Sequence, residues 1–361
     1  MVTTAVPGGR AYTRARGLIA PVAMWALWRL AHLAIVLAAG GRPARWWDDG
    51  YYRLILRQGY EHYAPYGDWQ QTNFFPLLPW LTRVTQELVR SETVAMHLVV
   101  TAAQIATVLL LFELGKTYFD RRVALGAVAL LLLSPASVFL WMFFSEGLFL
   151  AFSMGAILAA ERRRRAVRPE LAAGVAATRS MGVLMVIPLA LAQLRRNRPD
   201  RRLWFALLPV LGLAAVMAAQ WIQAGDPLAF TKVSKLWGRR TTLPITTLFE
   251  RLDLVLDRGF GLVSVLDFVA VGVAIALALR VRRVGLPWSM QAFTWIAILT
   301  PLASGLAFSW LRYMMAAWPL YLVAADWLQR RMRATWVVVG ATLAFTTWRA
   351  LVAWHDGSFI G

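Results

Sequence analysis

The sequence is built largely from apolar runs about as long as a membrane-crossing helix, and this pattern limits the folds open to the chain. A bilayer core about 30 Å thick is crossed by roughly 20 apolar residues in a helix. Hydrophobic residues make up 59% of the 361 positions and charged residues only 16%, against about 25% charged residues in soluble domains. We therefore predict an all-α, polytopic transmembrane bundle in which residues 1–361 form a single domain. About nine full spans are predicted, at 18–40, 93–117, 123–142, 147–160, 203–224, 259–280, 286–304, 309–328 and 335–354.

The basic residues indicate membrane orientation rather than nucleic-acid binding. The formal net charge is +19, but the arginines lie in short clusters between the apolar runs. Short basic loops of this kind mark the cytoplasmic side. No small-residue cleavage site follows the first run, so we expect a retained helix and a cytoplasmic N-terminus. This topology places two long loops, 41–92 and 225–258, on the outer face, and we expect short amphipathic helices in the first.

One further apolar stretch, 169–194, has basic residues at both ends and Arg179 near its middle. If both ends are cytoplasmic, the stretch cannot cross once, and an arginine at mid-span costs about 2.5–3.5 kcal/mol. Each arm of about 10–12 residues is too short to span. We therefore predict a re-entrant helical hairpin that turns between Arg179 and Gly182. Such a hairpin requires protein or water around its turn, so Arg179 is expected to line a polar cavity.

The first outer loop begins with acidic and aromatic side chains that suit sugar chemistry. Asp48 and Asp49 follow Trp47 and precede Tyr51 and Tyr52. Aromatic rings stack on sugars, and a carboxylate beside a second carboxylate has a raised pKa that suits a general base. The three aromatic residues are candidates for the acceptor side of a cavity. An interfacial aromatic belt with exposed acids has the same composition, and both interpretations stay open on the residues alone.

The second outer loop is basic on the face where positive charge is least expected. It contains Asp226, Lys232, Arg239 and Arg240. Guanidinium and ammonium groups bind phosphate oxygens, so a lipid-phosphate ligand would explain this loop. Contact with anionic lipid headgroups is the alternative.

Three other ionisable residues lie at the ends of predicted spans or inside them. Glu146 begins a predicted span. Its carboxylate either interacts favourably with the positive end of the helix dipole or belongs to a functional site. Arg312 begins another, as a snorkelling anchor or a site residue. Asp267 lies within a span and is a functional candidate by default, but the sequence does not indicate its partner.

No metal or cofactor site is predicted. The chain has no cysteine, so disulfides and thiolate ligands are excluded. The four histidines lack metal-ligand spacing. No glycine-rich phosphate loop is present, which argues against a nucleotide-driven pump.

Six short motifs follow one another along about 270 residues of the chain. The motifs are Trp47-Asp48-Asp49-Gly50-Tyr51-Tyr52 with Gly59-Tyr60, Phe74-Phe75-Pro76-Leu77-Leu78-Pro79, Ser145-Glu146-Gly147-Leu148-Phe149-Leu150, Ala177-Thr178-Arg179-Ser180-Met181-Gly182, Gly225-Asp226-Pro227-Leu228-Ala229-Phe230, and Arg312-Tyr313 with Pro319-Leu320. Each motif alone is weak, but together and in this order they resemble those of the PIG-V-type mannosyltransferases, a family of the GT-C superfamily of membrane glycosyltransferases.

The resemblance implies a GT-C-like fold and an inverting, metal-independent transferase. The implied donor is a polyprenyl-phosphate-linked sugar, with mannose expected, and the implied acceptor is a lipid or glycolipid at the outer face. The family's catalytic aspartate maps onto Asp48. Glu146, Arg179 and Arg312 match motif positions expected near the same cavity.

This sequence departs from the family pattern at three points. Asp49 replaces a usually small residue, Tyr51-Tyr52 replaces a Trp-Tyr pair, and Ser180 replaces a proline. Asp49 leaves open whether Asp48 acts as a single base. The sequence indicates neither the acceptor, the linkage nor the oligomeric state. A flippase for lipid-linked sugars would require inward access and inverted repeats, and a non-catalytic subunit would lack a cavity at Asp48.

Overall fold

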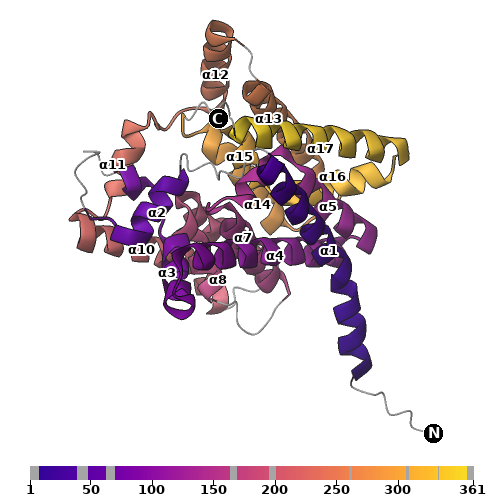
Figure 1. The fold of residues 1–361 in the computed structure, drawn as a ribbon, viewed down its shortest axis with the longest axis horizontal. Helices are drawn as coiled ribbons and strands as arrows, with labels where there is room; N and C mark the ends of the chain where they lie inside the picture. The colour runs from indigo at the N-terminus through magenta and orange to yellow at the C-terminus, as the bar shows by residue number, and fades with distance from the viewer. Residues whose placement is uncertain are drawn as a thin grey trace.

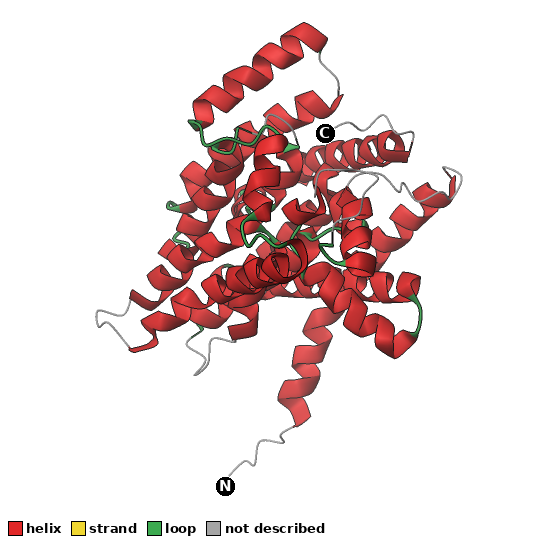
Figure 2. Cartoon of the chain, turned by 90° about the vertical axis from the view of Figure 1, so that its left-hand side faces the viewer, coloured by secondary structure: helices red, strands yellow, loops and turns green. Residues whose placement is uncertain are grey.

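The computed structural model describes residues 8–38, 48–61, 70–162, 169–194, 201–259, 262–305, 309–331 and 333–355. Within these ranges every regular element is a helix and none is a strand (Figure 2), which confirms the predicted all-α class. The α-helices are α1 (Gly8–Ala38), α2 (Asp48–Gln58), α3 (Leu77–Val89), α4 (Glu92–Tyr118), α5 (Arg121–Leu133), α6 (Val138–Trp141), α7 (Glu146–Glu161), α8 (Pro169–Thr178), α9 (Val186–Leu194), α10 (Leu208–Ala224), α11 (Ala229–Leu236), α12 (Pro244–Arg258), α13 (Leu262–Val281), α14 (Trp288–Leu302), α15 (Trp310–Met315), α16 (Pro319–Gln329) and α17 (Arg333–His355). Four 3-10 segments accompany them, η1 (Gln70–Asn73), η2 (Pro135–Ser137), η3 (Ser180–Met185) and η4 (Arg201–Leu207).

Several helices have the length and apolar character of membrane spans. In the described ranges, four stretches meet both criteria, namely Gly17–Ala38, Glu92–Tyr118, Trp204–Ala224 and Ser264–Val281. A fifth is counted if Arg121–Leu133 and Pro135–Trp141, which are bent by 69° to each other, form one broken span. The predicted span 335–354 lies on the continuous 23-residue helix α17, which does not meet both criteria, and the other predicted spans coincide with shorter or interrupted helices. The count of nine therefore stays a prediction, as does the orientation of the chain.

Local sequence signals explain where helices begin, end and bend. The hydroxyl of Ser91 caps α4, and the carboxylate of Asp120 caps α5 by accepting from Val123 N at 2.8 Å. Such caps satisfy amides that a helix leaves free at its N-terminus. Pro135 follows α5 and cannot continue its hydrogen-bond ladder, so the chain turns through η2 and α6 toward the start of α7.

The predicted break at Arg179 is present. Helix α8 ends at Thr178, Arg179 is extended, and η3 leads into α9. A Cβ on Gly182 would lie 2.2 Å from the carbonyl oxygen of Val175, so only glycine allows η3 to pack this closely on α8. Helix α8 packs on α7 and α10, whereas α9 packs on α14 and η4. The turn is therefore where the sequence predicted it, and its re-entry from one membrane face stays a prediction.

Helix α10 approaches α8 closely through small residues. A Cβ on Gly212 would lie 1.9 Å from the carbonyl oxygen of Ala173. Glycine and alanine at such a crossing let helix backbones approach closely in an apolar medium. This contact fixes the helix that leads into Arg179.

Helices form in both long predicted loops, and the two loops meet through α11 and η1. The first carries α2, η1 and α3, and the second carries α11 and α12. Helix α11 packs on η1, and α3 packs on α4 (Figure 1). The prediction of short helices in the first loop is confirmed, and both loops contribute to the same region of the molecule.

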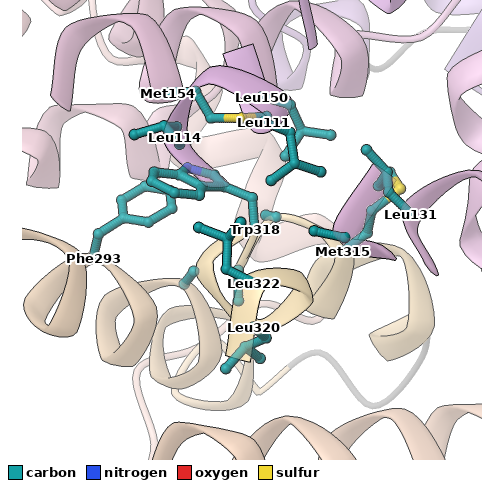
Figure 3. Packing of buried hydrophobic residues seen from close by; sticks show 14 of the residues in the cluster. Leu111, Leu114, Leu131, Leu150, Met154, Phe293, Met315, Trp318, Leu320 and Leu322 are labelled. Atoms are coloured by element: carbon teal, nitrogen blue, oxygen red, sulfur yellow. The ribbon is translucent and has the colours of Figure 1, made fainter. Parts of the chain in front are cut away.

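A large apolar core joins the first and second halves of the chain. Trp318, which immediately precedes α16, and Phe293 of α14 pack with ring centroids 5.6 Å apart, and leucines of α4 and α7 surround them (Figure 3). Trp318 and Phe293 are almost fully buried, and truncating such an aromatic side chain costs about 3–5 kcal/mol. The core holds α7, which begins with Glu146, against the segment that carries Arg312.

Candidate active site

Asp48 is the first residue of α2 and is largely buried. A carboxylate suits this place because the helix dipole is positive at its N-terminus. One turn later, the hydroxyl of Tyr52 donates to Ser145 Oγ at 2.7 Å. Burial and the carboxylates of Glu146 and Asp48 raise the pKa of Tyr52 well above its usual value. Tyr52 therefore stays protonated and ties α2 to the residue that precedes α7.

Glu146 is the first residue of α7, and its side chain is only 2% exposed. Arg179 Nη1 donates to Glu146 Oε1 at 2.7 Å, and Arg312 Nε donates to the same oxygen. Glu146 lies at a helix N-terminus and also joins two arginines, and its part in a functional site stays a prediction. A buried carboxylate with two guanidinium partners stays ionised, since each partner favours the charged form.

Arg312 joins the two carboxylates of the site. Its Nη1 donates to Asp48 Oδ2 across 264 residues of sequence, while its Nε binds Glu146. The guanidinium also lies over the ring of Phe144, with 4.7 Å to the centroid. Because the side chain is almost fully buried, Arg312 is part of the molecular interior and not a snorkelling anchor.

The network extends to the second outer loop through Tyr313. Arg239 Nη2 donates to the hydroxyl of Tyr313 at 3.1 Å, and the guanidinium of Arg179 lies 5.2 Å from the centroid of the same ring. Three guanidinium groups and two carboxylates meet here. With all five ionised, the cluster has a net charge of +1, which suits one anionic ligand.

A cavity of about 140 Å³ opens beside this network. A single water needs only about 10–15 Å³ on the same kind of measure, so the cavity accepts a larger ligand group. One wall is aromatic and amide-bearing, and the other is cationic and hydroxyl-rich. The lining residues are Asp48, Tyr52, Asn73, Phe74, Phe75, Thr178, Arg179, Ser180, Met181, Trp237, Arg239, Thr300, Pro301, Ser304, Ser309, Arg312 and Tyr313.

Two predicted residues of α2 lie next to the cavity without lining it. Asp49 is buried, and its Oδ2 accepts from Arg53 Nε at 2.8 Å. Tyr51 donates to Gln70 Oε1 and stacks on Phe74, with ring centroids 4.7 Å apart. Tyr51 thus contacts the cavity residue Phe74, whereas Asp49 pairs with Arg53, which does not line the cavity. Trp47 lies outside the described residues.

Three predicted residues of the second loop do not reach the cavity. Lys232 is mostly exposed and pairs with Asp226 at 2.6 Å, a contact that lowers the pKa of Asp226. Arg240 is exposed and pairs with Glu250. Only Arg239 of the predicted basic residues in this loop points into the site, so the donor-binding role predicted for Lys232 and Arg240 has no geometric support.

Sequence reasoning missed most of the cavity wall. Thr300, Ser304 and Ser309 surround the end of α14 and the start of α15, and Asn73 and Trp237 come from the two outer loops. Small hydroxyl residues beside Pro301 at the end of an apolar run were the available signal. Trp237 lies between the lysines and the arginines of its loop, and no sequence pattern distinguishes it.

The basic residues of the second loop allow a paired test of the cavity. Arg239→Gln is expected to raise the donor KM about tenfold, because a charge-assisted hydrogen bond contributes about 1.5–3 kcal/mol. Lys232→Gln and Arg240→Gln are expected to change it less than about threefold, because exposed ion pairs contribute little. The measurement is donor titration on all three purified variants. Equal effects at all three positions would mean that loop charge, and not the cavity, governs binding.

Among the described residues, no group of three or more His, Cys, Asp or Glu side chains is arranged to hold a metal ion. The carboxylates of the site are instead bound to arginines.

Comparisons with known proteins agree with the motifs. Residues 41–200 match the family model described as Mannosyltransferase (PIG-V), and this segment contains Asp48, Glu146 and Arg179. The resemblance drawn from the motifs is thereby confirmed over these residues. No curated protein sequence is significantly similar to the chain.

Among solved structures, the chain is similar to an oligosaccharyltransferase of Archaeoglobus fulgidus crystallised with a tethered acceptor peptide. The identity is 14% and the TM-score 0.47, with 91% of this chain and 55% of that chain covered. The chain thus spans about half the length of that protein. The family match and the apolar helices together support a multi-pass membrane protein of the glycosyltransferase class.

Proposed function

We propose that this chain transfers a sugar, with mannose expected, from a polyprenyl-phosphate donor to a lipid or glycolipid acceptor at the extracytoplasmic face of the membrane. The observation that carries the proposal is the buried network of Asp48, Glu146, Arg179 and Arg312 beside one cavity. The family match over residues 41–200 supports the glycosyl-transfer chemistry and favours mannose. The reaction is proposed to be metal-independent and inverting.

The charge of the network supports a phosphate ligand. A sugar linked to a lipid through a phosphodiester has one negative charge, and the cluster has one net positive charge. When the sugar leaves, the phosphate becomes a monoester and gains negative charge. Arg179, Arg239 and Arg312 are placed to stabilise that developing charge, which is where preorganised donors contribute most to rate.

Asp48 is the proposed general base. The acceptor hydroxyl gives its proton to the Asp48 carboxylate, and its oxygen forms a bond to the anomeric carbon of the sugar. The bond between that carbon and the phosphate oxygen breaks, and its electron pair leaves with the lipid phosphate. A single displacement of this kind inverts the anomeric configuration. Asp48 lines the cavity, so it can reach a bound acceptor.

The contact between Asp48 and Arg312 suggests an order of binding. The carboxylate of Asp48 is engaged by Arg312 Nη1. A donor phosphate that binds Arg312 competes for the same N–H groups and releases Asp48 toward the acceptor. Donor binding before acceptor binding therefore prepares the base.

The aromatic wall is the proposed place of the sugar. Phe74 and Trp237 pack edge to face with centroids 5.6 Å apart, and both line the cavity. Aromatic faces bind the apolar faces of sugars, while Asn73 brings an amide to the same wall. The presence of a cavity at Asp48 also argues against the interpretation of the chain as a non-catalytic subunit.

The proposal is tested by supplying the purified protein in lipid nanodiscs with polyprenyl-phosphate mannose and extracted membrane lipids. We expect release of polyprenyl phosphate and a mannosylated lipid of inverted anomeric configuration. Polyprenyl-phosphate glucose and a polyprenyl-phosphate pentose, tested in parallel, decide the sugar. Movement of intact donor across proteoliposome membranes without transfer would instead support the flippase, and the absence of both activities would refute the proposal.

A further inference from the structure

Asp267 is a fully buried carboxylate that the proposed reaction does not use. It lies on α13, and its side chain has no exposed surface. A buried carboxylate costs several kcal/mol unless it is paired and hydrogen-bonded. Its partners therefore indicate what the residue does.

One oxygen of Asp267 caps the short helix that carries the arginine of the site. Leu311 N donates to Asp267 Oδ1 at 2.8 Å, and the amides of Ser309 and Trp310 are also directed at the carboxylate. The local N-cap, Ser309, has a left-handed backbone with φ 61° and makes no side-chain cap bond. Helix α15 thus takes its cap from 44 residues away in the sequence.

The other oxygen ties the same helix to the second outer loop. Arg251 Nη2 of α12 lies 3.4 Å from Asp267 Oδ2 and 3.3 Å from Ser264 Oγ. Arg251 is itself buried. Removing one partner of such a buried pair is destabilising, because the other charge is then left buried and unpaired.

Helix α15 has only six residues, yet Arg312 and Tyr313 both extend from it into the cavity. Because a helix of this length has little stability of its own, its orientation depends on contacts with other parts of the chain. The cap from Asp267 fixes its N-terminal end, immediately before Arg312.

We propose that Asp267 is a positioning residue that holds α15 so that Arg312 meets the donor phosphate, and that Arg251 links this helix to the second outer loop. The inference rests on the proposed function, because it assigns Asp267 a part in donor binding. It names no contact between Asp267 and the substrate. Substitution of Asp267 is therefore expected to change the KM of the donor and not the KM of the acceptor.

The test compares Asp267→Asn and Asp267→Ala for donor KM, acceptor KM and binding of farnesyl phosphate, a short polyprenyl phosphate. Alanine removes the cap and is expected to raise the donor KM and the farnesyl phosphate Kd about tenfold, with acceptor KM unchanged. Asparagine keeps an oxygen that can accept from Leu311 N, so its donor KM and farnesyl phosphate Kd are expected to rise less than those of the alanine variant. Asp326→Asn is the matched control, because Asp326 pairs with Arg330 on α16, away from the cavity.

Testing the Asp267 substitution in protein that already carries Arg312→Lys distinguishes a positioning role of Asp267 from general destabilisation of the fold. In Arg312→Lys protein, Asp267→Asn is expected to add little to the donor KM, because groups that act as a unit have non-additive effects. Additive effects, or equal rises in donor and acceptor KM, would overturn the inference. If Arg312→Lys alone leaves farnesyl phosphate binding unchanged, the proposed phosphate site fails instead. If the alanine variant does not fold, the asparagine variant and Arg251→Gln give the same comparison.

Discussion

Replacing Asp48 by asparagine is expected to lower turnover by at least about a hundredfold, because a positioned general base contributes about 10²–10⁴ in rate. The same change is expected to leave donor affinity unchanged or to strengthen it. The asparagine side chain would no longer hold Arg312 through an ion pair, so a phosphate would meet less competition for that guanidinium. The measurements are single-turnover transfer and farnesyl phosphate binding on the same preparation.

Asp49→Asn is the matched control for this prediction. The residue is adjacent, buried and also acidic, but its carboxylate pairs with Arg53 and does not line the cavity. We expect turnover within about threefold of wild type, with some loss of thermal stability, because a half-buried ion pair contributes only modestly. Similar losses at both positions would show a shared proton, and near-wild-type activity of the Asp48 variant would end the single-base hypothesis.

The sequence predicts the elements of this fold well because membrane helices obey a simple rule. Backbone groups in an apolar medium must be satisfied within the segment, so each long apolar run becomes a helix. Run 93–117 lies on one continuous helix, α4, and the described part of the first run, residues 18–38, lies on α1. The rule does not predict where a helix is interrupted. The sequence therefore predicted one span over 309–328, whereas the structure has two helices, α15 and α16, and the chain turns between them at Ala316 to Trp318.

The charged residues show which part of the site the sequence can predict. Asp48, Glu146, Arg179 and Arg312 were identified from motifs, and all four meet in the structure. The sequence did not distinguish neighbouring residues of one loop that lie inside the site from those that lie outside it. Arg239 and Arg240 are adjacent, yet one binds Tyr313 at the cavity and the other binds Glu250 on the surface.

The difference between those two arginines is set by tertiary contacts that no local pattern contains. Arg240 N donates to the carbonyl of Ser304 at 2.9 Å, which fixes the segment between α11 and α12 against the end of α14. On the segment held there, Arg239 and Arg240 have different partners, the hydroxyl of Tyr313 and the carboxylate of Glu250. Asp267 is a similar case, because its position in a span was visible in the sequence but its partners, Leu311 N and Arg251, were not.

Arg312→Gln is expected to have the largest combined effect on activity and stability. Glutamine is shorter, uncharged and unable to bind Asp48 and Glu146 together as the guanidinium does. Removing one partner of a buried ion pair costs about 3–5 kcal/mol, because the remaining charges stay buried. We expect a lower Tm and a loss of transfer of at least about a hundredfold, since preorganised donors at a developing charge contribute on that order.

A double variant distinguishes the loss of stability from the loss of transfer activity. In Arg312→Gln with Asp48→Asn, the carboxylate that has lost its guanidinium partner becomes neutral, while Glu146 keeps its pair with Arg179, so Tm is expected to recover in part while transfer stays low. Arg312→Lys is expected to keep more stability than glutamine but little activity, because an ammonium cannot reproduce the planar fork. Arg330→Gln, at an exposed pair just past the end of α16, is the control for charge loss alone. Recovery of transfer together with Tm in the double variant would show that Arg312 stabilises the fold and does not bind the donor phosphate.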